Sequence, residues 1–503
     1  MTTDDSPSLA HRTALGAVWL VSWRLISRLL GFGSTLILAR LLMPGDFGIV
    51  AIATTYVTAF DALSGVGTED VIVRSPNPSR ALFDTAFTML AFRGLINAAL
   101  VMISAPFVAR AFNEPRLLPV LLTIAVLPVL DGFENIRIAE FRRNLRFDRE
   151  FILYLVPRLV SVATTITVVL VQRTFWAMVI GIIAGKVCRV GLTYFMQPFL
   201  PRLTFSAWHE LLGYSFWTWA ASVVGFVRDR GWTLLLGVML SATDVGIFNI
   251  AAEIAQLPIT EMVSPISRAA FSGISASRNA GGDIAHSLPR IIGVVLLVTL
   301  PAALGISSLA YQIVMIGLGP GWATATTIIA VIGASSPSLV IMTMANTALA
   351  ATGNIRYNFF ITTFSAAFAL GGAAIGAHFW GLRGVTAVFV IVLTVESVGF
   401  LVITMRILGG KVSSIAHQVW RPFLASAAMA GALYVSGLGW SSASGSVADL
   451  ILHAGITATV GAVIYGSVLL LLWRLSGMPD GAEHFLLSAG RLSLGRFRRP
   501  RQA

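Results

Sequence analysis

Long apolar segments dominate this sequence. Many approach the roughly 20 residues that a helix needs to cross a bilayer. The chain of 503 residues is 56% hydrophobic and only 12% charged, unlike a typical soluble domain. The sequence therefore predicts an all-α integral membrane protein. We expect about fourteen transmembrane helices, at residues 15–40, 46–66, 84–109, 117–138, 151–171, 175–197, 213–239, 245–268, 288–312, 324–349, 358–379, 382–405, 419–439 and 450–474.

The basic residues indicate how these helices cross the membrane. Alternate connections carry most of the arginines, as in the cluster Arg142, Arg143, Arg146 and Arg149. Short cytoplasmic loops are enriched in Lys and Arg, so we expect a multi-pass protein with both termini in the cytoplasm. The net charge of +12 lies mainly in these loops and in the C-terminal tail, so it does not indicate binding to nucleic acid. No connection is long enough to form a soluble domain.

An internal repeat divides the chain into two lobes. The segment Leu41–Ala53 (LLMPGDFGIVAIA) recurs 198 residues later as Met239–Ala251 (MLSATDVGIFNIA), and Asn144–Phe147 recurs 210 residues later as Asn354–Tyr357. Six expected helices separate the copies, so the halves share one orientation and a pseudo-two-fold axis along the membrane normal is expected. The expected regions are a cytoplasmic N-terminus (1–14), a six-helix N-lobe (15–197), a six-helix C-lobe (213–405), a terminal helix pair (419–474) and a basic cytoplasmic tail (475–503).

Seven cationic side chains interrupt the apolar segments. A charge at bilayer depth is costly, so such residues usually face a cavity inside the protein, and a mostly cationic set indicates an anionic cargo. The guanidinium group suits phosphate because its planar fork donates paired hydrogen bonds and stays charged. We therefore predict a cationic cavity built by Arg24, Arg28, Arg93, Arg158, Lys186, Arg228 and Arg230.

These seven residues also have a structural interpretation. Arg24 and Arg28 are four positions apart and share a helix face, yet a structural ion pair, for example between Arg24 and Asp61, would also explain a buried arginine. In Arg228-Asp229-Arg230 the aspartate is placed to satisfy one of its neighbours. Arg93 and Arg158 lie shallow enough to snorkel to the interface. Lys186 lies deeper, with Arg189 on its side of the helix.

Acidic residues are fewer in the apolar segments. Asp61, Glu253 and Glu261 are candidates for coupling a flow of H⁺ or Na⁺ to transport, or they neutralise neighbouring arginines. Asp131 and Glu134 lead into an arginine-rich connection, where we expect them to be solvated. The single cysteine, Cys188, and the scattered histidines have no metal-ligand spacing, and the sequence carries no catalytic motif. We therefore expect neither an enzyme nor a cofactor beyond a coupling ion.

Three motifs carry a resemblance to a known family. Ala39–Gly48 (ARLLMPGDFG) resembles the first-hairpin signature of bacterial polysaccharide and O-antigen flippases, within the multidrug/oligosaccharidyl-lipid/polysaccharide exporter superfamily. Ser27–Phe32 (SRLLGF) supports it and is also similar to the lipid II flippase branch. Trp380–Val385 (WGLRGV) matches the opening of the twelfth helix. The resemblance covers roughly residues 15 to 475.

This resemblance implies a flippase of the bacterial inner membrane. Its expected cargo is an undecaprenyl-pyrophosphate-linked oligosaccharide for O-antigen, capsule or exopolysaccharide, passed between two lobes by alternating access. Membrane lipids and a polymerase or export machinery are the expected partners. A lipid II flippase and a multidrug or cation antiporter of the same fold stay open as alternatives. A membrane glycan polymerase is disfavoured because it would normally add a sizeable extramembrane loop or a catalytic carboxylate motif.

Overall fold

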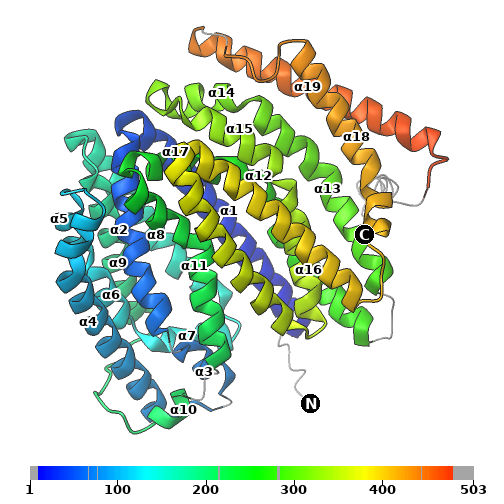
Figure 1. Cartoon of the computed structure of the whole chain (residues 1–503). Helices are drawn as coiled ribbons and strands as arrows, with labels where there is room; N and C mark the ends of the chain where they lie inside the picture. Colours follow the sequence, from blue (N-terminus) through cyan, green and yellow to red (C-terminus); the bar gives the residue numbers. More distant parts are fainter. Residues whose placement is uncertain are drawn as a thin grey trace, which may run out of the picture. The chain divides into compact units, whose positions relative to one another are not determined.

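The protein is built from helices. The computed structural model describes residues 9–65, 67–75, 77–212, 216–279, 284–442 and 445–479, and within these ranges all regular structure is helical (Figure 1). In chain order the helices are α1 (Leu9–Leu41), α2 (Pro44–Ser64), α3 (Thr68–Arg74), α4 (Arg80–Ala111), α5 (Leu117–Ile124), α6 (Val126–Gly132), η1 (Ile136–Ile138), α7 (Ala139–Arg143), α8 (Phe147–Gln172), α9 (Trp176–Met196), α10 (Trp208–Leu212), α11 (Phe216–Met239), α12 (Ala242–Asn279), α13 (Ile284–Ser308), α14 (Ala310–Ile313), η2 (Val314–Leu318), η3 (Pro320–Trp322), α15 (Ala325–Ser335), α16 (Pro337–Ala351), α17 (Ile355–Ile407), α18 (Ser413–Val435) and α19 (Val447–Leu475).

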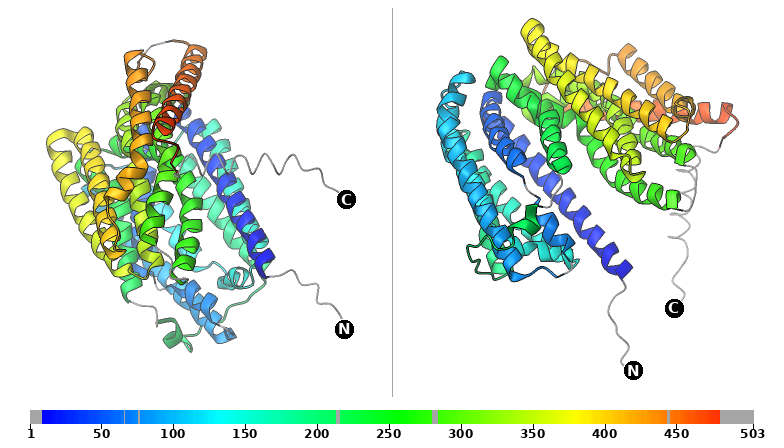
Figure 2. Two further views of the ribbon diagram at one scale, coloured as in Figure 1. Left: turned by 90° about the vertical axis from the view of Figure 1, so that its right-hand side faces the viewer. Right: turned by 60° about the horizontal axis from the view of Figure 1, so that its bottom comes forward.

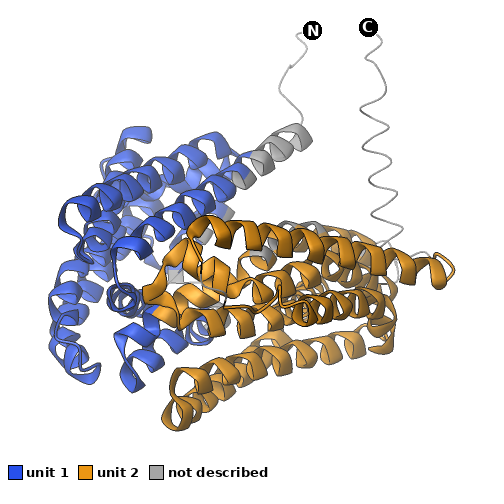
Figure 3. Cartoon of the chain, turned by 90° about the horizontal axis from the view of Figure 1, so that it is seen from above, with its two compact units in different colours: residues 1–246 blue, residues 247–503 orange. Residues whose placement is uncertain are grey.

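The chain divides into two compact units, Met1–Gly246 and Ile247–Ala503 (Figure 3). In the first unit, α8 packs along both α1 and α9, and α4 packs along α6. In the second unit, α13 packs against α15, α16 and α18, and α16 packs against α17. The lobes expected at 15–197 and 213–405 stay a prediction.

Helices lie where the sequence predicts membrane-spanning segments. Each of the fourteen expected segments overlaps a helix, with residues 213–215 outside the described ranges. By length and hydropathy, seven helices of the described chain qualify as spans, or up to nine when each of two bent pairs is one span. The chain is thus an all-helical, multi-pass membrane protein, and fourteen crossings stay a prediction. The connection expected at 269–287 is helical up to Asn279, so that boundary was wrong.

Two of the expected segments are bent rather than straight. Leu117–Gly132 and Ile136–Arg143 meet at 59°, and Ala325–Ser335 and Pro337–Ala351 meet at 45°. Pro337 explains the second bend, because a proline ring lacks the N–H that a continuous helix requires and clashes with the preceding turn. The first bend falls at residues 133–135, so Glu134 lies within it and Asp131 lies in the last turn before it.

Two further expected segments, 358–379 and 382–405, form the arms of a hairpin within α17. Gly381 reverses the chain with φ 58° and ψ −142°, a conformation that glycine adopts without steric cost. A Cβ built on Gly376 would lie 2.8 Å from the backbone of Gly384, so the glycines also let the two arms touch. The motif WGLRGV therefore encodes a tight turn between helices.

The two copies of the repeated motif contact each other in the first unit. A Cβ built on Gly48 would lie 1.6 Å from the carbonyl oxygen of Ala242, and one built on Gly246 would lie 1.9 Å from that of Pro44. Residues 44 and 48 correspond to residues 242 and 246 under the offset of 198. The contact is therefore reciprocal. Gly48 packs on the first residue of the second copy's helix, and Gly246 packs on the first residue of the first copy's helix.

In each motif copy the aspartate takes part in the hydrogen bonds that cap the start of its helix. Asp46 accepts a hydrogen bond from the backbone N–H of Met43 at 3.0 Å. Asp244 accepts one from Ser241 Oγ at 2.6 Å, and Ser241 Oγ accepts from the backbone N–H of Asp244 at 3.1 Å. Such bonds satisfy donors at a helix start that have no partner within the helix. The motif is thus a helix start whose glycine permits close packing.

In the second unit, α18 and α19 form a hairpin beside α13 (Figures 1 and 2). Tyr465 of α19 donates a hydrogen bond to the carbonyl oxygen of Leu297 in α13 at 2.5 Å. A small apolar core joins the three helices, built by Leu297, Ala425, Met429, Leu433, Tyr465 and Leu469. The arginine-rich tail expected at 475–503 lies outside the described residues beyond 479.

Candidate functional site

The seven predicted cations all belong to the first unit. They lie on five helices: Arg24 and Arg28 on α1, Arg93 on α4, Arg158 on α8, Lys186 on α9, and Arg228 and Arg230 on α11. Arg24 and Arg230 are exposed, and the others are half-buried. The structure brings some of them into two clusters, one around Lys186 and one around the contact of α1 with α8.

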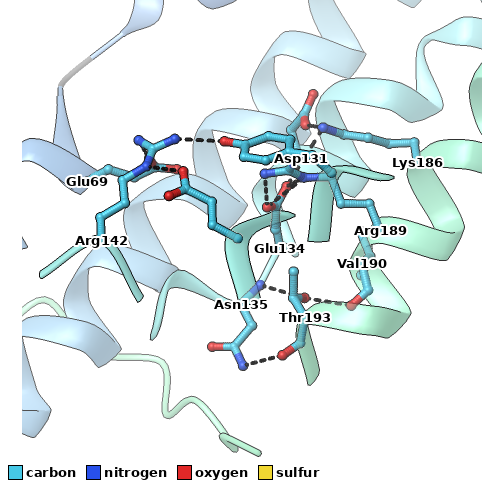
Figure 4. Close-up of polar contacts among 11 residues, drawn as sticks. Glu69, Asp131, Glu134, Asn135, Arg142, Lys186, Arg189, Val190 and Thr193 are labelled. Atoms are coloured by element: carbon cyan, nitrogen blue, oxygen red, sulfur yellow. Dashed lines mark hydrogen bonds and ion pairs between the residues drawn. The ribbon is translucent and has the colours of Figure 1, made fainter. Parts of the chain in front are cut away.

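The first cluster joins the end of α6 to α9 (Figure 4). Lys186 forms an ion pair with Asp131 and lies 3.8 Å from Glu134 Oε2. Arg189 Nη2 lies 2.7 Å from Glu134 Oε1, and its Nε donates to the two oxygens at 2.9 and 3.0 Å. Such forked, charge-assisted bonds are among the stronger hydrogen bonds in proteins. The side chains of Glu134 and Arg189 are only 13% and 19% exposed.

The ion pairs correct one expectation from the sequence. Asp131 and Glu134 are not solvated neighbours of a loop, because both form ion pairs with basic side chains of α9. The sequence carried a usable signal for this pairing. Asp131 and Glu134 are three residues apart, as are Lys186 and Arg189, so two acids and two bases have matched spacing.

Tyr154 of α8 connects this cluster to α1. The guanidinium carbon of Arg189 lies 4.7 Å from the centre of the Tyr154 ring, and Trp23 stacks on that ring at 5.3 Å. Arg142 Nη2 donates to the Tyr154 hydroxyl at 2.7 Å, while Arg142 Nε donates to Glu150 at 2.7 Å. Aromatic and cationic groups thus continue the polar network from α9 to the first helix.

A cavity of about 390 Å³ opens beside the ion pairs, within the first unit. Asp61 accepts a hydrogen bond from Asn97 Nδ2 at 3.2 Å and interacts electrostatically with Arg93 and Lys186. Two of the predicted residues, Asp61 and Arg93, therefore line one cavity, and Asp131 on the same wall pairs with Lys186. The charged side chains that line the cavity are Asp61, Glu69, Arg93, Asp131 and Glu134.

The second cluster lies where α8 meets α1. A Cβ built on Gly31 would lie 2.6 Å from Arg158 Nη2, so the guanidinium group of Arg158 rests against the α1 backbone. Residues 24, 28 and 31 share one face of a helix. Arg158 therefore approaches the face of α1 that carries Arg24 and Arg28. The Nε atom of Arg158 is buried and has no hydrogen-bond partner in the described part of the chain.

The remaining predicted residues lie outside these clusters. Arg228 Nε donates to Asp229 at 2.8 Å, so the aspartate of the triplet does engage one of its neighbours. Glu253 and Glu261 are exposed on α12, in the second unit. Within the described residues, no group of three His, Cys, Asp or Glu side chains could hold a metal ion.

Comparison with known proteins places the chain in a family. A family profile described as "Polysaccharide biosynthesis protein" matches residues 37–327, more than half of the chain. The chain belongs to this polysaccharide biosynthesis protein family. It is 21% identical over 437 residues to the lipopolysaccharide biosynthesis protein WzxC of Escherichia coli (strain K12), an alignment that covers 83% of this chain and 86% of that protein. It is also 22% identical over 322 residues to the succinoglycan biosynthesis transport protein ExoT of Rhizobium meliloti (strain 1021), with 63% of this chain and 65% of that protein covered.

Solved structures show the fold of this family member. The lipid II flippase MurJ superimposes with a TM-score of 0.75 at 15% identity, over 90% of this chain and 99% of that chain. A multidrug resistance MATE family transporter superimposes with a TM-score of 0.60 at 15% identity, over 78% of this chain and 96% of that chain. The polysaccharide biosynthesis protein described here therefore has the MurJ and MATE fold.

Proposed function

We propose that this protein is a flippase of the bacterial inner membrane that moves undecaprenyl-pyrophosphate-linked oligosaccharide repeat units from the cytoplasmic to the periplasmic leaflet. Its family, its fold and the transport function in the printed name of ExoT support this proposal. The observation that carries the choice of an anionic cargo is the contact of Arg158 with the arginine-bearing face of α1. The glycan would build O-antigen, capsule or exopolysaccharide.

The pyrophosphate group is the part of this cargo that arginine recognises best. Arg24, Arg28 and Arg158 would donate forked hydrogen bonds to its oxygens, and Arg228 and Arg230 of α11 would add charge. An isolated arginine in a membrane helix is costly, and Arg158 Nε has no protein acceptor in the described ranges. A phosphate oxygen would supply the missing acceptor. Arg93 and Lys186 would add positive charge at the cavity that Asp61, Glu69, Asp131 and Glu134 line, which we call the carboxylate cavity.

The transport cycle would use the lobes predicted from the repeat. In this proposal, fourteen helices cross the membrane as two six-helix lobes and a terminal pair, with both termini in the cytoplasm. The reciprocal contact between the repeated motifs supports a pseudo-two-fold relation between the lobes. Alternating access would then be a rocking of one lobe against the other. A polymerase or an export machinery would receive the flipped unit.

Movement of H⁺ or Na⁺ would drive the cycle. Asp61 is the best-placed carboxylate, because it lines the cavity together with Arg93 and interacts electrostatically with Arg93 and Lys186. A change in its protonation would alter these electrostatic interactions directly. Glu253 and Glu261 would serve in the same way in the second unit.

The role of Arg158 is testable in a deletion strain that lacks the endogenous protein. We expect Arg158→Ala and Arg28→Ala to lower surface polysaccharide by roughly tenfold or more, because each removes charge-assisted hydrogen bonds to the pyrophosphate. Gly31→Leu should act similarly by displacing the guanidinium group of Arg158. The matched control is Arg146→Ala, whose side chain is 47% exposed in a pair with Asp148. Full polysaccharide from all three variants at normal protein levels would contradict the proposal.

A second test separates structure from cargo binding at Lys186. Lys186→Met leaves Asp131 without its ion-pair partner, and Asp131→Asn in the same chain removes the uncompensated charge. If Lys186 contacts the cargo, the double variant should regain its melting temperature while its rate of flipping lipid-linked glycan in proteoliposomes stays several-fold low. Recovery of both properties would show that Lys186 only stabilises the fold.

A further inference from the structure

A second pocket lies beside the start of α4. Its volume is about 470 Å³, within the range of small-ligand sites, and its walls include Arg80, Arg137, Glu140, Phe83 and Phe199. The pocket therefore combines two guanidinium groups with aromatic rings. Because α4 is a membrane-spanning helix by length and hydropathy, the pocket lies where this helix leaves the bilayer.

Arg137 lies against two aromatic rings that meet edge to face, with their centres 6.3 Å apart. Its guanidinium carbon lies 5.6 Å from the centre of the Phe83 ring and 5.7 Å from that of Phe199. Its Nη2 donates to Glu140 at 3.3 Å, while Nε is buried without a hydrogen-bond partner among the residues described. Gln197 Nε2 also donates to Glu140, at 2.7 Å. The carboxylate is thus well satisfied, whereas the guanidinium group retains donor capacity.

Arg80 supplies the second charge. It is the first residue of α4, its side chain is 62% exposed, and its Nε lies 3.6 Å from Asp84. The Asp84 side chain is only 6% exposed and also accepts the backbone N–H of Arg202 at 3.0 Å. Arg80 is therefore loosely paired and accessible. The positive end of the α4 dipole adds to the attraction for an anion.

An apolar strap borders the pocket. Residues 200–205 have no regular secondary structure and residues 206–207 form a turn. The segment 200–207 is fixed to α4, because Thr88 Oγ1 accepts the backbone N–H of Thr204 at 3.0 Å and Thr85 Oγ1 accepts that of Ala207 at 3.2 Å. The strap presents Leu200, Leu203 and Phe205, which are 84%, 74% and 52% exposed. Exposed apolar side chains on an ordered segment next to a spanning helix are typical of a surface that contacts lipid chains.

We infer that this pocket binds the phosphate headgroup of an anionic phospholipid, with Arg80 and Arg137 on the phosphate and the strap against the acyl chains. The predicted topology places this end of α4 in the cytoplasm, and the cytoplasmic leaflet carries anionic lipids that basic pockets between helices bind. This site does not depend on the proposed cargo. Its occupant would tether the strap, and the short helix α10 that follows it, to the membrane surface.

Native mass spectrometry of the purified full-length protein with added phosphatidylglycerol tests this inference. We expect Arg80→Gln/Arg137→Gln to weaken binding of phosphatidylglycerol by about tenfold or more, and Arg137→Lys to retain more of it than Arg137→Gln. Leu200→Glu, at an exposed position, should weaken binding without affecting folding. Arg146→Gln is the control arginine and should leave binding unchanged.

Three outcomes would overturn the inference. In the first, the wild type and a folded double variant bind phosphatidylglycerol equally well. In the second, the wild type binds phosphatidylglycerol and phosphatidylethanolamine equally well. In the third, millimolar inorganic phosphate displaces the lipid. The last result would identify the ligand as a soluble phosphate compound. If Arg80→Gln/Arg137→Gln does not fold, Leu200→Glu decides the question by itself.

Discussion

Replacing Gly48 by leucine should prevent the protein from accumulating as a folded species, and replacing it by alanine should cost about 3 kcal/mol or more of stability. Even a Cβ at this position would lie 1.6 Å from the carbonyl oxygen of Ala242. The obstructing atom belongs to a helix backbone, so no side-chain rotation can relieve the clash. Yield of monodisperse protein and the melting temperature in detergent measure the effect.

The control for Gly48 is Gly191→Ala. Gly191 lies within the spanning helix α9, and a Cβ there meets nothing within 4 Å. Its substitution should leave the melting temperature unchanged or slightly raised, since alanine favours helix more than glycine does. If the Gly48→Ala and Gly191→Ala variants have the same melting temperature, the predicted close contact at Gly48 is refuted.

The reciprocal position should behave in the same way. Gly246 corresponds to Gly48 under the repeat, and a Cβ there would lie 1.9 Å from the carbonyl oxygen of Pro44. We expect Gly246→Ala to lower stability by a similar amount. If one glycine tolerates alanine and its counterpart does not, the contact is not the symmetric one that the repeat implies.

The second large effect is expected at the ion pair of Arg189 and Glu134. Arg189→Ala should destabilise the protein by about 3 kcal/mol, because it leaves a largely buried carboxylate without its forked donor. Glu134→Ala/Arg189→Ala should recover much of this loss, since no uncompensated charge stays behind. Melting temperatures of the two single variants and the double variant form a double-mutant cycle.

The matched comparison is the exposed pair of Arg146 and Asp148, whose side chains are 47% and 48% exposed. Breaking a pair of this kind typically costs less than about 1 kcal/mol. If breaking either pair lowered the stability by the same amount, water would screen Glu134 as fully as it screens Asp148. The structure predicts otherwise, because the Glu134 side chain is only 13% exposed.

Hydropathy and the repeat predicted much of the fold. A spanning helix is recognisable from about 20 consecutive residues, so every expected segment coincides with helix in the described ranges. The turn between 379 and 382 was also predictable, and Gly381 occupies it. The repeat aligned Asp46 with Asp244, and both lie in the first turn of their helices. These features depend on neighbours in the sequence, and such local preferences are largely independent of the rest of the chain.

Contacts between charged residues on different helices did not follow from hydropathy or from the repeat. The sequence placed Lys186 and Arg158 inside apolar segments, yet it assigned Asp131 and Glu134 to solvent and gave Arg158 no neighbour. Which helix faces which, and where a helix bends, depends on packing between residues far apart in the chain. The sequence alone thus determined which segments form long apolar helices and which of their residues carry charge. Only the tertiary structure decided that α9 meets two carboxylates and that α8 brings Arg158 to α1, because an ion pair forms only where two side chains are brought within a few ångströms.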